Sequence, residues 1–304
     1  MKKKTIFQLV TVLIGFICLT TVANAQTADD AIMMSKKQWC NGVTYMYSNW
    51  HRYWEGTHNR ENLNLGTVKT QSVMLMSNYG ISDKLNVIVS APYIWTAATA
   101  GTLHGLKGFQ DITLDLKYEF YTAKVGHGRL SFIGVGSGSI PLTNYQNDFL
   151  PMSIGLGCKT LTARLTADYQ NGIFFSTISS GYVFRGNVNI DRTAYYTDQI
   201  HYTNEVNMSN QLMSNLNVGI RKKNLIVQAI LMNLYTFGGY DIRTNDMPFA
   251  NNQMNMTSLG VHLKYFIPFV PNLQVVGGAD YVIEGRNVGQ AQTYSGGLYY
   301  IFSL

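Results

Sequence analysis

The sequence predicts an all-β fold, a transmembrane antiparallel up-and-down β-barrel of about 12 strands. Three observations predict it: an export signal at the N-terminus, polar and apolar residues that alternate along many short segments, and a last segment that ends on an aromatic residue. Only 13% of the residues are charged, whereas soluble domains carry about 25%. Low charge without a second long apolar segment is typical of a membrane barrel, because only alternate strand residues meet lipid.

The N-terminus has the features of a secretory signal peptide. Three lysines at residues 2–4 precede an apolar run over residues 6–22, and Ala23-Asn24-Ala25 forms a small-x-small cleavage site. We therefore predict a signal peptide over residues 1–25, a mature chain from Gln26, and export to the outer membrane of a Gram-negative bacterium. Because the signal removes three lysines and no acids, the formal net charge falls from +6 to +3, which gives no basis for nucleic-acid binding.

Alternation of side-chain type indicates the strands directly. Residues 111–120 interleave five polar with five apolar residues, and residues 161–169 and 259–265 repeat this period of two. A helix cannot separate polar from apolar side chains in this way. The predicted strands, in a barrel domain over residues 40–304, are 41–55, 65–80, 84–95, 108–121, 129–140, 152–169, 173–186, 207–222, 224–239, 253–267, 272–285 and 291–302.

The connections between these strands differ in length on the two sides of the predicted barrel. Tight turns follow even-numbered strands, at residues 82–84, 170–172, 222–224 and 268–271, with a looser one at 122–128. Long loops follow odd-numbered strands, at residues 97–106, 143–150, 186–206 and 240–252. Short periplasmic turns and long outer loops are typical of outer-membrane barrels. Aromatic residues near both ends of the strands agree with two interfacial girdles.

Charged residues on the predicted strands share the face opposite the aliphatic residues. If Leu114 and Leu116 face lipid, then Asp115 and Lys117 face the lumen. The same phase gives the candidate lumen-lining set: Asp111, Asp115, Lys117, Glu119, Arg164, Asp168, Arg221, His262, Lys264, Asp280 and Glu284. These residues either brace the barrel through salt bridges or line a polar route that selects small solutes. The mixture of acids and bases argues against strong ion selectivity, and we favour bracing for most of them.

Residues 26–39 precede the first strand and contain a short apolar patch, residues 31–34, that follows Asp29 and Asp30. This stretch is either a periplasmic leader or a plug that folds into the lumen, and the leader is the simpler interpretation. The long loop over residues 186–206 carries three tyrosines, which either contact a permeant or only extend the barrel wall.

The sequence contains no motif for catalysis, a metal or a cofactor. Its six histidines form no i, i+2 or i, i+4 pairs, and none has a serine two residues later, as outer-membrane phospholipase does. We therefore expect no enzyme, no cofactor, and no catalytic, cofactor-binding or metal-binding residue. A lipid-modifying enzyme is the less favoured alternative, with His51, His58 and His104 as candidates. Cys40 and Cys158 fall on distant parts of the predicted strands, which predicts no disulfide.

The last predicted strand resembles the terminal signal by which outer-membrane barrels are recognised for assembly. Its elements are Ser295, Gly297, Tyr300 and Phe302. The departure from that signal is that two residues follow the final aromatic. The resemblance implies that the barrel assembly machinery is a partner, together with outer-membrane lipid.

Several segments resemble the family labelled "MetA-pathway of phenol degradation". They are Ala91-Pro92-Tyr93, the Gly-x-x-Asp strand start at residues 108–111 with Lys117-Tyr118 after it, residues 138–142 (Gly-Ser-Ile-Pro-Leu) and residues 181–185 (Gly-Tyr-Val-Phe-Arg). The family comprises outer-membrane barrels of the transporter class, noted beside channels for aromatic hydrocarbons and fatty acids. The resemblance implies a channel in which small compounds, hydrophobic or aromatic ones included, diffuse passively through the barrel. It supplies no binding residues.

The sequence leaves two further points open. A structural or surface-interaction barrel without transport is the alternative to the channel. The permeant and the oligomeric state do not follow from the residues, whereas nucleic acid is not expected as a partner.

Overall fold

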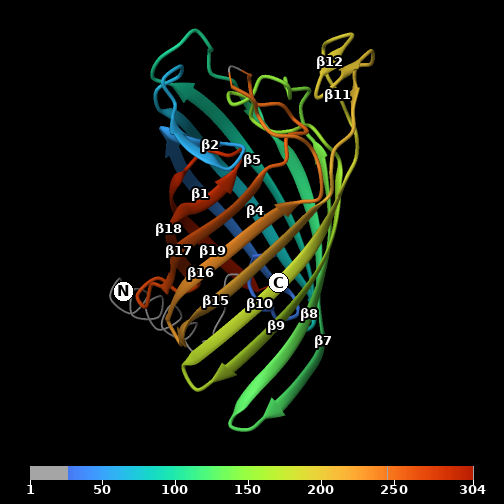
Figure 1. Ribbon diagram of the computed structural model, residues 1–304. Helices are drawn as coiled ribbons and strands as arrows, with labels where there is room; N and C mark the ends of the chain where they lie inside the picture. The colour runs from blue at the N-terminus through green and yellow to red at the C-terminus, as the bar shows by residue number, and fades with distance from the viewer. Residues whose placement is uncertain (1–26, 245, 304) are drawn as a thin grey trace, which may run out of the picture.

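The computed structural model describes residues 27–244 and 246–303, so the predicted signal peptide lies outside the described residues. Within them the chain forms a closed antiparallel barrel of 12 strands, which confirms the predicted fold class and strand count (Figure 1). The wall strands are β1 (Gln38–Trp50), β4 (Val68–Ser82), β5 (Leu85–Ala98), β7 (Asp111–Val125), β8 (Gly128–Pro141), β9 (Thr160–Asn171), β10 (Phe174–Arg185), β15 (Gln211–Lys222), β16 (Leu225–Thr236), β17 (Asn255–Phe266), β18 (Leu273–Arg286) and β19 (Gln292–Ser303).

The first and last strands close the barrel. β1 pairs with β19 in continuous antiparallel register from Gln38 opposite Ser303 to Asn49 opposite Gln292. Closure leaves neither strand with an open edge, as a membrane barrel requires. Among the described residues, no helix is long and apolar enough to cross a membrane.

Turns at one end of the barrel are short, and we call it the tight-turn end. The predicted looser turn at residues 122–128 is wrong: β7 runs to Val125 and β8 starts at Gly128, so only Gly126 and His127 connect them. Gly126 has a φ of 58°, a left-handed conformation that glycine adopts without the steric cost that a Cβ brings. β7 and β8 therefore extend as one long hairpin (Figure 1).

The opposite end carries the long connections, and we call it the long-loop end. Short strands lie within them: β2 (Arg52–Glu55), β3 (His58–Glu61), β6 (Lys107–Phe109), β11 (Val188–Asn189), β12 (Tyr195–Tyr196), β13 (Ile200–His201) and β14 (Glu205–Val206). β11 pairs with β14 and β12 with β13, and this hairpin rises above the barrel wall (Figure 1).

Two predicted strand boundaries are wrong at the long-loop end. The sixth wall strand starts at Thr160 and not at residue 152, because residues 152–158 pack among the loops: Met152 is fully buried against Leu65 and Val68. The first strand ends at Trp50, and residues 52–55 pair with β3 in a separate hairpin. Alternation continues into residues 152–158, so periodicity alone does not mark where the chain leaves the barrel wall there.

Apolar clusters hold the long-loop end together. The larger cluster, which we call the loop cluster, joins three loops through the buried residues Cys158, Val188, Ile190, Tyr195, Val206, Met208, Phe249 and Ala250. Cys40 lies in another cluster, with Met34 and Ile301, where β1 begins and β19 ends at the tight-turn end. The two cysteines thus belong to separate cores, and Cys158 precedes β9 instead of lying within it.

The two faces of the wall differ as alternation predicts. On β7, Leu114 and Leu116 are about half exposed, whereas Asp115 and Lys117 are buried. In a closed barrel the buried face of a strand is the interior one, so polar groups line the inside and apolar side chains cover the outside. This arrangement suits a barrel surrounded by lipid.

Candidate functional site

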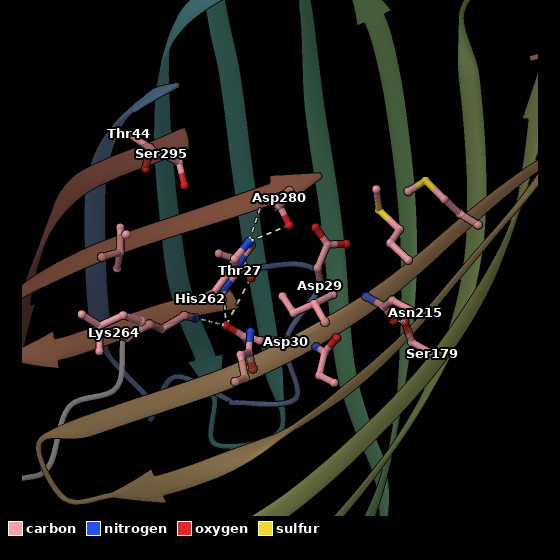
Figure 2. Close-up of a pocket in the computed structure, with 18 of the residues that line it drawn as sticks. Thr27, Asp29, Asp30, Thr44, Ser179, Asn215, His262, Lys264, Asp280 and Ser295 are labelled. Carbon is pink, nitrogen blue, oxygen red and sulfur yellow. Dashed lines mark hydrogen bonds and ion pairs between the residues drawn. The ribbon is translucent and has the colours of Figure 1, made fainter. Parts of the chain in front are cut away.

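The candidate site is a pocket of about 360 Å³ inside the barrel. Figure 2 shows that side chains from several wall strands point into it, together with the N-terminal segment, which we define as residues 27–37. One wall carries neutral polar groups on β10 and β15, Ser179, Asn215 and Asn217. Apolar side chains lie beside them, namely Met213, Ile230 and Met232. Charged residues from the N-terminal segment, β9, β17 and β18 also line the pocket, namely Asp29, Asp30, Arg164, His262, Lys264 and Asp280.

Lys117 on β7 anchors the N-terminal segment. Its side chain is fully buried, and its ammonium group donates to the Thr27 carbonyl at 2.8 Å, the Ile32 carbonyl at 2.9 Å and Asp30 Oδ1 at 2.9 Å. An ammonium group has three N–H donors, and each has an acceptor here. This complete pairing is what a buried charge needs, because an unpaired one would cost several kcal/mol.

Asp30 lies between two lysines from opposite parts of the wall. Lys264 on β17 reaches Asp30 Oδ2 at 2.6 Å (Figure 2). Lys117 donates to the other carboxylate oxygen, Oδ1. Burial by itself raises the pKa of Asp30, but the two ammonium groups outweigh it and hold the pKa well below the ordinary value of 3.8. The carboxylate therefore stays ionised throughout the neutral and mildly acidic range.

Further contacts fix the rest of the N-terminal segment. Asp29 forms an ion pair with Arg164 on β9. Met34 is fully buried, and its backbone exchanges two hydrogen bonds with the Asn86 side chain on β5, at 3.1 and 3.2 Å. Near the tight-turn end, the Lys36 N–H donates to Asp83 at 2.8 Å. The segment thus contacts three different parts of the wall.

Other predicted lumen-lining residues have partners within the wall. Asp168 pairs with Arg221 at 3.1 Å, and Arg221 also lies over the Phe175 ring, 4.2 Å from its centroid. His262 Nε2 lies 2.9 Å from Asp280 on the neighbouring strand (Figure 2). The Asp168–Arg221 pair links β9 to β15 across β10, whereas the His262–Asp280 contact joins the adjacent strands β17 and β18.

Three more predicted residues, all on β7, accept hydrogen bonds from neighbouring side chains. Their contacts are Arg129 to Glu119 at 2.7 Å, Ser137 to Asp115 at 2.5 Å and Tyr145 to Asp111 at 2.6 Å.

Glu284 does not share the face of Asp280. The pairing of β17 with β18 shifts between Thr257 and Ser258, so Glu284 pairs with Thr257 while Val282 pairs with Ser258. Val282 is buried and Glu284 is exposed. The bulge breaks the alternation from which Glu284 was assigned to the lumen.

The residues of the predicted assembly signal lie along β19. Ser295 lines the pocket, whereas Tyr300 and Phe302 form an aromatic pair with ring centroids 5.7 Å apart. A Cβ at Gly297 would meet the Val43 carbonyl at 2.6 Å, so β1 packs too closely there for a larger residue. A role in assembly stays a prediction.

Two parts of the pocket were missed by sequence reasoning. Residues 26–39 are predicted as either a leader or a plug, with the leader as the simpler interpretation, and Asp30 is not singled out, although the acidic pair at residues 29–30 matches the interior bases Lys117, Arg164 and Lys264. The amide groups of Asn215 and Asn217 were not singled out, because strand periodicity gives them no more weight than any other polar residue. Asn215 and Asn217 flank Leu216 on one strand, so an outward-facing Leu216 would have placed both amides inside the barrel.

The chain was compared with known proteins. No family model matches, and no curated protein matches. Among solved structures, the chain is similar to the COG4313 outer membrane channel from Pseudomonas putida F1, with 13% identity, a TM-score of 0.72, and coverage of 92% of this chain and 100% of that one. It is more distantly similar to the NanC porin (9% identity, TM-score 0.45, 84% and 98% covered) and to the CymD monoaromatic hydrocarbon channel (11%, 0.39, 89% and 89%).

The first of these similarities confirms the expected fold of an outer-membrane channel barrel. At this level of identity it concerns the fold alone.

Proposed function

We propose that the protein is a passive channel for small molecules in the outer membrane of a Gram-negative bacterium. The observation that carries the proposal is the pocket of about 360 Å³ within a closed barrel whose interior is polar. The half-exposed apolar side chains on the outer wall, such as Leu116, support a location in lipid. The predicted signal peptide supports export.

The pocket walls favour a permeant with both polar and apolar parts. Met213 and Met232 offer flexible apolar contacts, which adapt to different shapes. Asn217 lies next to them with a buried Oδ1 that accepts no hydrogen bond from the described residues. A small compound that places an apolar ring or chain on the methionines and a donor group at Asn217 would fit. Hydrophobic and aromatic compounds with one polar group meet this requirement.

Within this proposal, the N-terminal segment acts as a plug. Its ion pairs with Lys117, Lys264 and Arg164 support a position inside the lumen and not in the periplasm. A plug held by charges narrows the route without filling it, since the pocket lies beside it.

Single-channel conductance of the refolded barrel in a planar bilayer tests the channel and the plug together. Deletion of residues 26–36 keeps Gln38, which pairs with Ser303 where the barrel closes. We expect small, steady conductance in the full mature chain and a severalfold increase after deletion. Equal conductance in both would reject the plug, and no conductance in either would reject an open aqueous channel.

A structural or surface-interaction barrel is the second candidate. The observation in its favour is the loop cluster, which folds the long-loop end into a defined surface instead of open loops. If neither the full mature chain nor the deletion variant conducted ions, the structural or surface-interaction barrel would be favoured. A lipid-modifying enzyme has less support: of its candidate histidines, His104 packs its ring at a tilt against the Phe149 ring, with the centroids 5.0 Å apart.

A further inference from the structure

A second pocket lies among the loops at the long-loop end, away from the barrel interior. Its volume is about 210 Å³, and it lies between the loops that contain Asp148, Arg192 and Phe249. Apolar and aromatic side chains form most of its walls, among them Tyr195, Tyr196, Tyr240, Ile242, Met247 and Phe249. Tyr195 and Tyr196 belong to the long loop whose tyrosines are expected either to contact a permeant or to extend the barrel wall, and the proposed channel does not use this pocket.

The aromatic walls are held in place by the loop cluster. Tyr195 stacks on Phe249 with ring centroids 5.4 Å apart and on His201 at 4.7 Å. The Tyr240 hydroxyl donates to the Tyr196 carbonyl at 3.4 Å. Burial raises the pKa of Tyr240 to about 12, so its ring remains uncharged. The pocket is therefore preformed, which lowers the entropy cost of binding a ligand.

Asp148 lines this pocket and carries a buried carboxylate oxygen without a donor. The Asp148 side chain is 3% exposed, and its Oδ2 accepts from Arg192 Nε at 2.7 Å. Its Oδ1 is buried as well, and among the described residues it has no hydrogen-bond partner. A buried carboxylate oxygen without a donor costs free energy, so this atom favours a ligand that brings one.

The charges around the pocket balance one another and favour neither a cation nor an anion. Arg192 already neutralises Asp148, and the Arg243 guanidinium lies 5.4 Å from the centroid of the Tyr196 ring. A cation would meet these two positive groups. An anion would lie against Asp148 and Asp246. What remains is a neutral molecule with a donor for Asp148 and an apolar face for the rings.

We infer that this pocket binds a small neutral ring that carries a hydroxyl group, with the hydroxyl donating to Asp148 Oδ1 and the ring lying against Tyr196 and Phe249. Such a ring has two sources, an aromatic alcohol or a sugar. The inference does not depend on transport through the barrel, because the pocket belongs to the loops.

Ligand-observed saturation-transfer NMR on the refolded barrel tests this with three probes: benzyl alcohol, benzyl methyl ether, which has the same ring without the donor, and methyl glucoside. We expect benzyl alcohol to bind about tenfold more tightly than its ether, the difference that one hydrogen bond to a charged group makes. Methyl glucoside binding more tightly than benzyl alcohol would assign the site to sugars, and the reverse order to aromatic alcohols. The ether binding as tightly as the alcohol would overturn the inference.

Variants distinguish loss of a ligand contact from a disturbed loop structure. Asp148→Ala removes the acceptor and should weaken benzyl alcohol binding about tenfold without affecting the ether. Arg192→Gln breaks the same ion pair but retains the Asp148 carboxylate, so we expect a smaller loss of benzyl alcohol binding than in Asp148→Ala; an equal loss would assign the effect to the ion pair and contradict the hydrogen bond to Oδ1. Tyr196→Leu should weaken both ligands, whereas its matched control Tyr202→Leu changes a tyrosine that is 85% exposed and outside the pocket. Unchanged binding in Asp148→Ala, or equal losses in the two tyrosine variants, would contradict the assignment.

Discussion

The N-terminal segment and the loop cluster are both folded against the barrel, but different interactions hold them. The segment depends on a few charged atoms, chiefly Asp30 between Lys117 and Lys264. The loop cluster depends on eight buried residues with apolar packing, spread over three loops. Ion pairing inside a polar lumen concentrates the stabilisation in one carboxylate, so a single substitution should release the segment. Apolar packing distributes the stabilisation over many residues. A single substitution should therefore weaken the loop cluster but leave it folded.

The largest effect is expected from Asp30→Asn, which keeps the shape of the side chain but removes its charge. Both lysines then lose the charge of Asp30, and losing one partner of a buried ion pair costs about 3–5 kcal/mol. The segment should leave the lumen, and single-channel conductance should rise toward that of the deletion variant.

Asp29→Asn is the matched control, because the Asp29 side chain is 63% exposed. We expect little change in its conductance. If the two variants behaved alike, the segment would not depend on the Lys117–Asp30–Lys264 arrangement.

Phe249→Ala should produce the next largest effect, on the loop cluster. Removing a buried phenylalanine costs about 3–5 kcal/mol in a core, and less where the surrounding loops can collapse into the space. We expect faster proteolysis of the long loops with an intact barrel, measured by limited digestion and gel mobility. Phe269→Ala, at a side chain that is 85% exposed, is the control and should leave the digestion rate unchanged.

The pH dependence of the N-terminal segment follows from Asp30. Its pKa in the folded protein is below the ordinary value of 3.8. The stabilisation by its carboxylate is therefore fully present above 3.8 and is lost only as the pH falls through the lowered pKa. Conductance recorded from about pH 8 to pH 4 should show no opening of the plug. Opening within this range would indicate that another group controls the segment.

The smallest effect is expected for Arg129→Gln at the tight-turn end. Arg129 pairs with Glu119 at 2.7 Å, but its side chain is 63% exposed, and such ion pairs contribute under about 1 kcal/mol. We expect a slight decrease in thermal stability in detergent and unchanged conductance. A large loss of stability would show that this pair supports the long hairpin of β7 and β8.

Most wall strands could be predicted from the sequence, because the alternation that defines a strand depends only on neighbouring residues. Alternation along residues 111–120 places Lys117 on one face and Leu116 on the other in any strand, whatever lies next to it. The strand count and the closed barrel followed from this pattern and from the positions of the tight turns. Boundaries failed where a segment with strand-like alternation, such as residues 152–158, was held instead by apolar contacts with other loops.

The partners of these side chains were decided by tertiary structure. Asp30 is 87 residues from Lys117 and 234 from Lys264 along the chain, and no local pattern connects residues at such distances. The same holds for Asp148 and Arg192, which meet only after the loops fold together. The sequence by itself thus determined a barrel with a charged interior, since strand period and turn chemistry act between neighbours. Only the folded barrel decided that Asp30 lies in the lumen and that a pocket forms among the loops beside Asp148. Both arrangements require strands and loops that are distant in the sequence to meet.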